Sequence, residues 1–145
     1  MPTEPFTPPR PSNEPVYGYG PGSAERATLR EEIRRLEKET LDIPCVVGGV
    51  EMRPAGTFEL RAPHRHELKL ADVHAATAAE VEEAIRAAGE AKPEWESASA
   101  ADRAAVFLRA ADLLSTTRRD LINAATMLGQ SKTVHQAEID AVCEL

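Results

Sequence analysis

Aromatic residues, cysteines and long hydrophobic runs are all scarce in this chain of 145 residues. Only 4% of the residues are Phe, Trp or Tyr, so a core must be built from Ala, Leu, Ile and Val, and the small Ala side chains bury little area each. The two cysteines, Cys45 and Cys143, form no CxxC pair, and we interpret both as reduced thiols that pack as small hydrophobic groups. No apolar run approaches the roughly 20 residues of a membrane-spanning helix.

Positive charge is also in the minority. Lys and Arg number 17 against 24 Asp and Glu, which gives a net charge of −7. This balance disfavours nucleic acid and anionic membrane surfaces as partners. Residues 1–10 contain neither the hydrophobic stretch of a signal peptide nor the Arg-rich pattern of a transit peptide, so we expect a cytoplasmic protein.

The first third of the chain combines an arm, a surface helix and short strands. Residues 1–22 are rich in Pro and Gly, and such an arm orders only against another surface. Ser23 predicts the cap of a helix that runs to about Thr40, and Pro44 excludes further helix. Strands are expected at residues 45–47 and 50–52, which flank the hairpin signal Gly48-Gly49, and at residues 57–60 and 68–73. These strands are few and short, and they cannot close a sheet without support.

Helices are predicted from residue 77 onward. Thr77 with Glu80 forms a capping box, and Pro93 ends the helix after about residue 91. Ser99 caps the next helix, and a third spans about residues 118–128 and ends at Gly129. The predicted inward-facing residues of these last two helices are Val106, Phe107, Ala110, Leu113 and Leu114, then Leu121, Ile122, Ala125 and Leu128.

Residues 131–145 form the last predicted helix. Its apolar stripe consists of Val134, Ala137, Ala141 and Leu145. No cap follows Leu145, so we expect this helix to continue and the chain to be a piece of a larger protein. Glu138 falls within the stripe, whereas Asp140 and Glu144 lie toward one flank. A carboxylate at the edge of a buried stripe is either a salt-bridge partner or solvated boundary residue, or a polar group at a pocket wall that is available to a substrate ammonium group or an ordered water.

Motifs for catalysis are missing from the sequence. His64 and His66 could lie on one side of an extended segment, but two imidazoles without a third ligand make a weak metal site, and we predict no metal. His74 and His135 are interpreted as surface residues. Residues 18–22 superficially resemble a phosphate loop, but no strand precedes them and Pro21 removes one amide. Neither cysteine has an activating base nearby, so no catalytic residue is predicted.

Four strings of residues, taken in order, resemble one family. They are residues 43–49 (IPCVVGG), 92–95 (KPEW), 101–114 (ADRAAVFLRAADLL) and 127–141 (MLGQSKTVHQAEIDA). The pattern from Arg103 to Leu114, with Arg118, Arg119 and Gly129 after it, is similar to aldehyde dehydrogenases in general. Residues 43–48 and 129–140 are more specific, and they resemble the 1-pyrroline-5-carboxylate dehydrogenase family, also called L-glutamate γ-semialdehyde dehydrogenases. The resemblance covers roughly residues 14–145.

The resemblance implies an α/β fold and an NAD-dependent enzyme of proline degradation. Such an enzyme oxidises the small molecule L-glutamate γ-semialdehyde to glutamate, and the parent enzyme is expected to be a homo-oligomer. Residues 1–22 would be an extended arm, and residues 23–145 an incomplete amino-terminal part of the NAD-binding domain that is cut within a helix. The family's catalytic cysteine, oxyanion-hole Asn, general-base Glu and NAD-binding loops all lie further along, so neither Cys45 nor Cys143 is the nucleophile and this chain alone is expected to be inactive.

One position carries over from the family. Glu144, in the segment AEIDAVCEL, matches a glutamate that borders the aldehyde pocket, and we predict that it binds substrate. The alternative from a different class is a small helical adaptor that binds a partner through its last helix and catalyses nothing.

Overall fold

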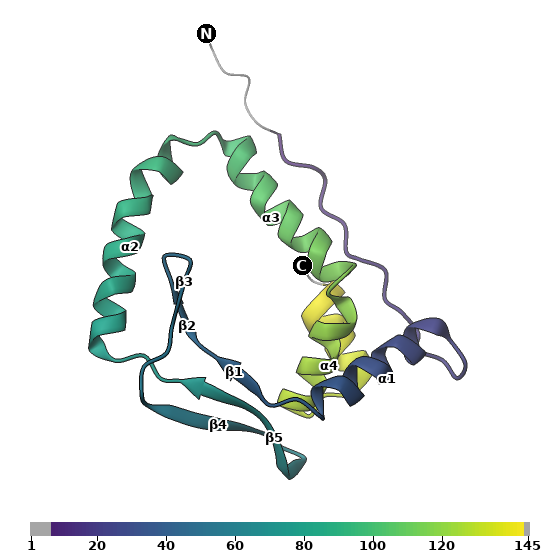
Figure 1. Cartoon of the computed structure of the whole chain (residues 1–145). Coiled ribbons are helices and arrows are strands. Elements are labelled where there is room, and N and C mark those ends of the chain that lie inside the picture. The colour runs from purple at the N-terminus through teal and green to yellow at the C-terminus, as the bar shows by residue number, and fades with distance from the viewer. Residues whose placement is uncertain (1–6, 144–145) are drawn as a thin grey trace.

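One helix, five short strands and then a run of helices follow one another along the chain, which confirms the predicted α/β class (Figure 1). The computed structural model describes residues 7–143. After an extended arm come α1 (Ala24–Leu36), β1 (Leu41–Ile43), β2 (Cys45–Val47), β3 (Val50–Met52), β4 (Thr57–Ala62) and β5 (Arg65–His74). The remaining elements are α2 (Ala78–Ser97), α3 (Ala100–Ser115), α4 (Arg119–Gln130), α5 (Val134–Glu138) and η1 (Ile139–Cys143), which is one turn of π-helix.

The cap predicted for α1 is present. The Oγ atom of Ser23 accepts a hydrogen bond from the N–H of Arg26 at 3.4 Å. The helix ends at Leu36 rather than near Thr40, because the chain turns there and enters β1. This strand was not among the predicted ones, since three residues carry too little alternation to be recognised without their partner strand.

The strands form two small sheets. In the larger sheet β5 lies between β1, which runs parallel to it, and β4, which is antiparallel. The hairpin of β2 and β3 is the second sheet, and its turn residues Gly48 and Gly49 have φ angles of 57° and 81°. Only glycine adopts this left-handed conformation freely, so the Gly-Gly signal identified the turn correctly.

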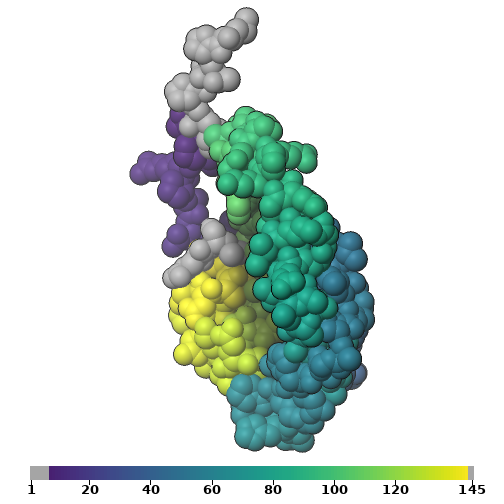
Figure 2. Space-filling model, turned by 90° about the vertical axis from the view of Figure 1, so that its left-hand side faces the viewer, coloured from purple at the N-terminus to yellow at the C-terminus, as the bar shows by residue number. Residues whose placement is uncertain are grey.

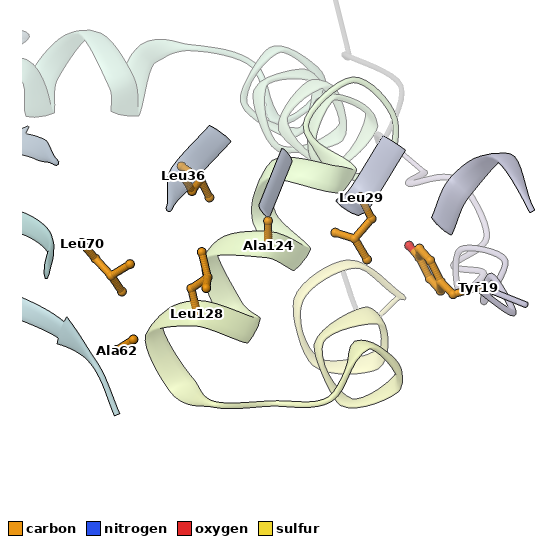
Figure 3. Packing of buried hydrophobic residues seen from close by; sticks show 7 residues of the cluster. All are labelled: Tyr19, Leu29, Leu36, Ala62, Leu70, Ala124 and Leu128. Atoms are coloured by element: carbon orange, nitrogen blue, oxygen red, sulfur yellow. The ribbon is translucent and has the colours of Figure 1, made fainter. Parts of the chain in front are cut away.

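The core lies where α1 and α4 cover the larger sheet. Figure 3 shows Leu29 and Leu36 of α1 facing Ala124 and Leu128 of α4, with Leu70 of β5 beyond them. Tyr19 of the arm closes the other end of this cluster. The sheet is therefore supported by helices, as its small size requires.

Two predictions about α2 and α3 are wrong. α2 continues through Pro93 to Ser97, and the ring of Trp95 meets the ring of Phe107 edge-on at 6.4 Å. Proline removes only one helical N–H, and contacts beyond it hold the last turn in place. Val106, Phe107 and Ala110 are exposed rather than buried, although the ring of Trp95 contacts that of Phe107. The side view in Figure 2 shows the long face of α2 similarly open, between the C-terminal helices and the strands.

The end of the chain also differs from its prediction. α4 passes through Gly129, and the left-handed cap residue is Ser131, with φ of 56°. A new helix then begins after Thr133, whose side chain and that of Gln136 cap each other's backbone. Ala125 is exposed, Ala137 is buried as predicted, and Leu145 lies outside the described residues. Among residues 7–143 no helix is both long and apolar enough to cross a membrane.

Candidate functional site

The residue predicted to bind substrate, Glu144, lies outside the described part of the chain. The structure instead describes the segment that leads to it, the π-helical turn η1. Val142 and Cys143 of this turn are buried, and Glu138 is the last α-helical residue before it. Turns of π-helix are rare and occur frequently at functional sites. The surroundings of Glu138 and η1 are therefore the candidate site.

Glu138 is a fully buried carboxylate with four hydrogen-bond donors. Its Oε1 atom accepts from the backbone N–H of Tyr17 at 2.8 Å and from Nη2 of Arg119, with which it forms an ion pair. Its Oε2 atom accepts from the Tyr19 hydroxyl at 2.8 Å and from Nδ2 of Asn123 at 2.7 Å. An isolated charge at this depth would be strongly destabilising, so these four donors are what makes the buried carboxylate tolerable.

Arg119 is the cationic partner and is itself buried. Its Nη1 atom donates to the carbonyl of Ser115 at 3.2 Å, and Nη2 donates to the carbonyl of Pro15 at 2.5 Å. The guanidinium carbon lies 3.7 Å from the centre of the Tyr17 ring, a cation–π contact. Arg119 therefore binds the arm through both the backbone and an aromatic side chain.

The pKa shifts in this cluster follow from its geometry. Burial by itself raises the pKa of Glu138, but the hydrogen bonds from Arg119, Tyr17, Tyr19 and Asn123 outweigh burial and hold the pKa below its ordinary value. Burial and the bond to Glu138 raise the pKa of the Tyr19 phenol far above its ordinary value. The carboxylate therefore stays ionised and the phenol stays protonated near neutral pH.

This arrangement can hold segments together, but it cannot perform acid–base chemistry. A carboxylate whose oxygens both accept two hydrogen bonds has no free lone pair directed at a substrate, and its lowered pKa makes it a poor base. Within residues 7–143 two buried atoms of the cluster lack a hydrogen-bond partner, Nε of Arg119 and Oδ1 of Asn123. We call the four buried residues Tyr19, Arg119, Asn123 and Glu138, together with the exposed Tyr17 whose backbone N–H binds Glu138, the buried polar cluster.

The sequence predicted that Glu138 lies within the buried stripe, and this prediction is confirmed. A salt bridge was one of the roles considered for this carboxylate, and the structure shows that salt bridge, with Arg119. Asp140 is likewise paired, with Nζ of Lys132 at 2.5 Å on the surface. The rest of the cluster could not be found from sequence. Tyr17 and Glu138 are separated by 121 residues, and no local spacing rule connects such positions.

The histidine predictions have mixed outcomes. His74 is not a simple surface residue, because its Nδ1 lies 2.7 Å from the carbonyl oxygen of Pro54 and its Nε2 lies 2.8 Å from Oδ1 of Asp42. His64 contacts the hydroxyl of Ser131 at 2.8 Å, which is not a metal-binding arrangement. No group of three or more His, Cys, Asp or Glu in the described residues is placed to hold a metal ion.

The two cysteines lie in different places and differ in exposure. Cys45 is half-buried, with its Sγ 3.4 Å from the carbonyl oxygen of His74. Cys143 is buried in η1, with its Sγ 4.0 Å from the carbonyl oxygen of Pro15. Both therefore pack within the fold, in agreement with their interpretation as small hydrophobic groups.

Comparison with known proteins assigns a family to this geometry. Residues 50–144 match the profile of the aldehyde dehydrogenase family. A mitochondrial delta-1-pyrroline-5-carboxylate dehydrogenase of Dictyostelium discoideum is 45% identical over 94% of this chain and 24% of that protein. The protein of the same name from Bos taurus is 46% identical, over 92% of this chain and 24% of its own length. The chain thus spans about a quarter of the length of the curated relatives it matches.

Solved structures give the same result. The delta-pyrroline-5-carboxylate dehydrogenase of Mycobacterium tuberculosis superposes with a TM-score of 0.94 at 48% identity, covering 99% of this chain and 27% of that one. The structure of the same enzyme bound with NAD has a TM-score of 0.93, covering 98% of this chain and 27% of that one. The fold described above is therefore found within a larger dehydrogenase.

Proposed function

The chain belongs to the aldehyde dehydrogenase family, and from this premise we propose that it forms the amino-terminal part of an NAD-dependent L-glutamate γ-semialdehyde dehydrogenase. The parent enzyme would oxidise the semialdehyde, which is in equilibrium with 1-pyrroline-5-carboxylate, to L-glutamate in proline degradation. One observation carries the proposal. Relatives named delta-1-pyrroline-5-carboxylate dehydrogenase are 45–46% identical over more than nine-tenths of the chain.

The glycine-rich segment at residues 18–22 does not have the arrangement of a phosphate-binding loop for NAD. Residues 7–17, the described residues before this segment, form no strand, and the carbonyl oxygen of Gly20 accepts a hydrogen bond from the N–H of Ser23 at 3.1 Å. A dinucleotide phosphate needs such a loop between a strand and a helix, so these residues do not fit the cofactor. We therefore assign no hydride-transfer step to this chain, and NAD would be held by other parts of the parent enzyme.

Glu144 is the residue of this chain that we propose to contact the substrate. A carboxylate at this position would pair with the ammonium group of the semialdehyde. Loss of a hydrogen bond to a charged group costs about 1.5–3 kcal/mol, which corresponds to a fall of about ten- to a hundredfold in kcat/KM.

The test uses the full-length enzyme and follows NADH formation with the semialdehyde as substrate. Glu144→Ala should lower kcat/KM for the semialdehyde by that factor and leave the KM for NAD nearly unchanged. Asp140→Ala is the matched control, because Asp140 is an exposed carboxylate in the same segment and pairs with Lys132 on the surface of the described part of the chain. If Glu144→Ala leaves the kinetics unchanged, Glu144 returns to a salt-bridge role. If the wild-type enzyme does not reduce NAD with this substrate, the proposed function is wrong.

Three further expectations remain proposals. Residues 23–145 would be an incomplete part of the NAD-binding domain, and the parent enzyme would assemble as a homo-oligomer, which size measurement of the full-length protein tests. A cytoplasmic location is also open to test by cell fractionation, since the relatives from Dictyostelium discoideum and Bos taurus are named mitochondrial. The adaptor alternative receives no support from these relatives.

A further inference from the structure

An apolar pocket opens between the larger sheet and α4, and its volume is about 170 Å³. One wall is a stripe of α4, and the facing wall comes from β1, β4 and β5. The residues at these walls that the argument uses are Leu41, Ile43 and Leu60 on the sheet and Leu121, Ala125 and Gly129 on α4. Among the described residues, every side chain that lines this pocket is apolar.

The floor of the apolar pocket is the hydrophobic core itself. Leu36, Leu70 and Leu128 line the pocket and also belong to the core cluster, and Figure 3 shows these three side chains at one end of that cluster. At the mouth of the pocket, Leu41 and Leu60 remain 37% and 39% exposed. The core of the described residues therefore continues outward and reaches the surface at this pocket.

Water is a poor occupant for such a pocket. A buried water molecule needs two to four polar partners, whereas an apolar cavity of about 150 Å³ stays dry and takes up a molecule such as benzene. The apolar pocket is of similar size, and the described residues offer it no polar side chain. The occupant that matches its size and chemistry is one large apolar side chain, such as that of Leu, Ile, Met or Phe.

Gly129 independently indicates a close neighbour outside the described residues. It lies within α4, where glycine is less stable than alanine, and its φ angle is not positive. A Cβ atom added to Gly129 would meet no atom within 4 Å, so no described group requires the missing methyl group. Glycine is also found where another group approaches the backbone closely, and this role fits a glycine at the wall of the pocket.

Two observations favour the remainder of the parent polypeptide as the source of that side chain. The chain spans about a quarter of the length of its curated relatives, so most of the parent enzyme lies outside it. In α2, moreover, none of the 20 residues is buried by the described part of the chain, although helices owe most of their stability to packing. A core that reaches the surface and a helix without a packed face are both expected when a fold is completed by further chain.

We propose that the apolar pocket receives one large apolar side chain from the part of the parent enzyme that follows this chain, and that this contact docks the described fold onto the remainder of the enzyme. The docked side chain lies between the sheet and α4 and packs against Gly129. This inference rests on the proposed function only in that the parent enzyme is longer than the chain.

Photo-crosslinking of the full-length enzyme identifies the neighbour of the pocket. A diazirine analogue of leucine nearly preserves the shape of the side chain, and light then joins it to an adjacent group. Trypsin should release residues 39–61 as one peptide, because the bond between Arg53 and Pro54 resists cleavage. The leucines of this peptide are Leu41 and Leu60, and both line the pocket. Crosslinks from this peptide therefore report what lies against the pocket.

The expected crosslink joins this peptide to a peptide beyond residue 145 of the same subunit. Oligomers assembled from a mixture of light-nitrogen and heavy-nitrogen subunits show whether the crosslink lies within one subunit. Crosslinks between light and heavy peptides mean that a second copy of the enzyme fills the pocket, which overturns the proposal. Crosslinks confined to residues 1–145 mean that the pocket stays open, which also overturns it.

Two glycine variants of the full-length enzyme should change its melting temperature in opposite directions. Alanine stabilises a helix relative to glycine where its methyl group has room. Gly89→Ala is the matched control, because Gly89 is exposed in α2 beside the surface ion pair of Arg86 and Glu90, and it should raise the melting temperature. Gly129→Ala should lower it, since the methyl group competes with the docked side chain for space. A melting temperature that does not fall in Gly129→Ala means that this space is empty and overturns the proposal.

The crosslinks and the enzyme assay can fail independently. If the crosslinks reach beyond residue 145 but the enzyme does not reduce NAD with the semialdehyde, the proposed function is wrong and the docking stands. If the enzyme reduces NAD with this substrate but no crosslink reaches beyond residue 145, the docking is wrong and the proposed function stands.

Discussion

Replacing Glu138 by Ala should release the arm from the rest of the fold. The change removes the acceptor for the backbone N–H of Tyr17, the hydroxyl of Tyr19 and the guanidinium of Arg119. Arg119 is left as a buried cation without its anionic partner, and it retains the carbonyls of Ser115 and Pro15 and the ring of Tyr17. Breaking a buried ion pair by removing one partner costs about 3–5 kcal/mol, because the other charge stays buried without compensation.

Amide hydrogen exchange of the full-length enzyme, read on peptides from the arm, measures this local opening. At about 1.4 kcal/mol per factor of ten, a loss of about 3–5 kcal/mol accelerates exchange at Tyr17 by roughly two to three and a half orders of magnitude. Peptides from β4 and β5 should exchange as in the wild type, since local stability differs across a structure. Asp140→Ala, which breaks an exposed pair with Lys132, should cost at most about 1 kcal/mol.

Two results would refute this reasoning. Unchanged exchange at Tyr17 would mean that the carboxylate does not hold the arm. Equal acceleration in the arm and in the β4–β5 hairpin would mean that the variant loosens the whole fold, so that the effect is not confined to the cluster.

Two further predictions concern the sheet and α2. The carbonyl of Pro54 and the carboxylate of Asp42 raise the pKa of His74, so its contribution to stability is fully present below the unfolded value of about 6.5 and is lost as the pH rises through the folded value. Asp42→Asn should move the pKa of His74 back toward its ordinary value in an NMR titration, and an unchanged midpoint would exclude Asp42 as a cause. Thr77→Ala removes the cap of α2, which is shared with Glu80, and should destabilise its first turn by about 1 kcal/mol. Amide hydrogen exchange in the Thr77→Ala variant should be faster in that turn and unchanged elsewhere. Exchange in the turn equal to that of the wild type would contradict the prediction.

Local signals in the sequence predicted the starts of helices well. Ser23, Thr77 and Ser99 each cap the helix that follows them, because a cap depends only on residues two or three positions away. Helix ends were predicted less accurately. Gly129 was predicted to end α4, because glycine adopts the left-handed conformation freely. In the structure this conformation is adopted two residues later, by Ser131.

Features that depend on distant partners were the ones that the sequence did not predict. β1 exists because Leu41 pairs with Ala71 of β5, thirty residues further on. Phe107 fits an inward-facing stripe but is 67% exposed, because periodicity identifies the apolar face of a helix and not what covers it. The buried polar cluster is the extreme case, since its members combine only once the chain has folded.

The distance along the chain between Tyr17 and Glu138 also affects the order of events during synthesis. Tyr17 leaves the ribosome before Glu138, because its anchoring carboxylate lies 121 residues later, which is about 6–24 s at about 5–20 residues per second. During this delay the arm has no docking partner at Glu138. Its prolines, among them Pro8, Pro9 and Pro15, lack the N–H groups that a strand needs to pair with other chains. The composition of the arm thus disfavours strand pairing with other chains before the residue that receives it has been made.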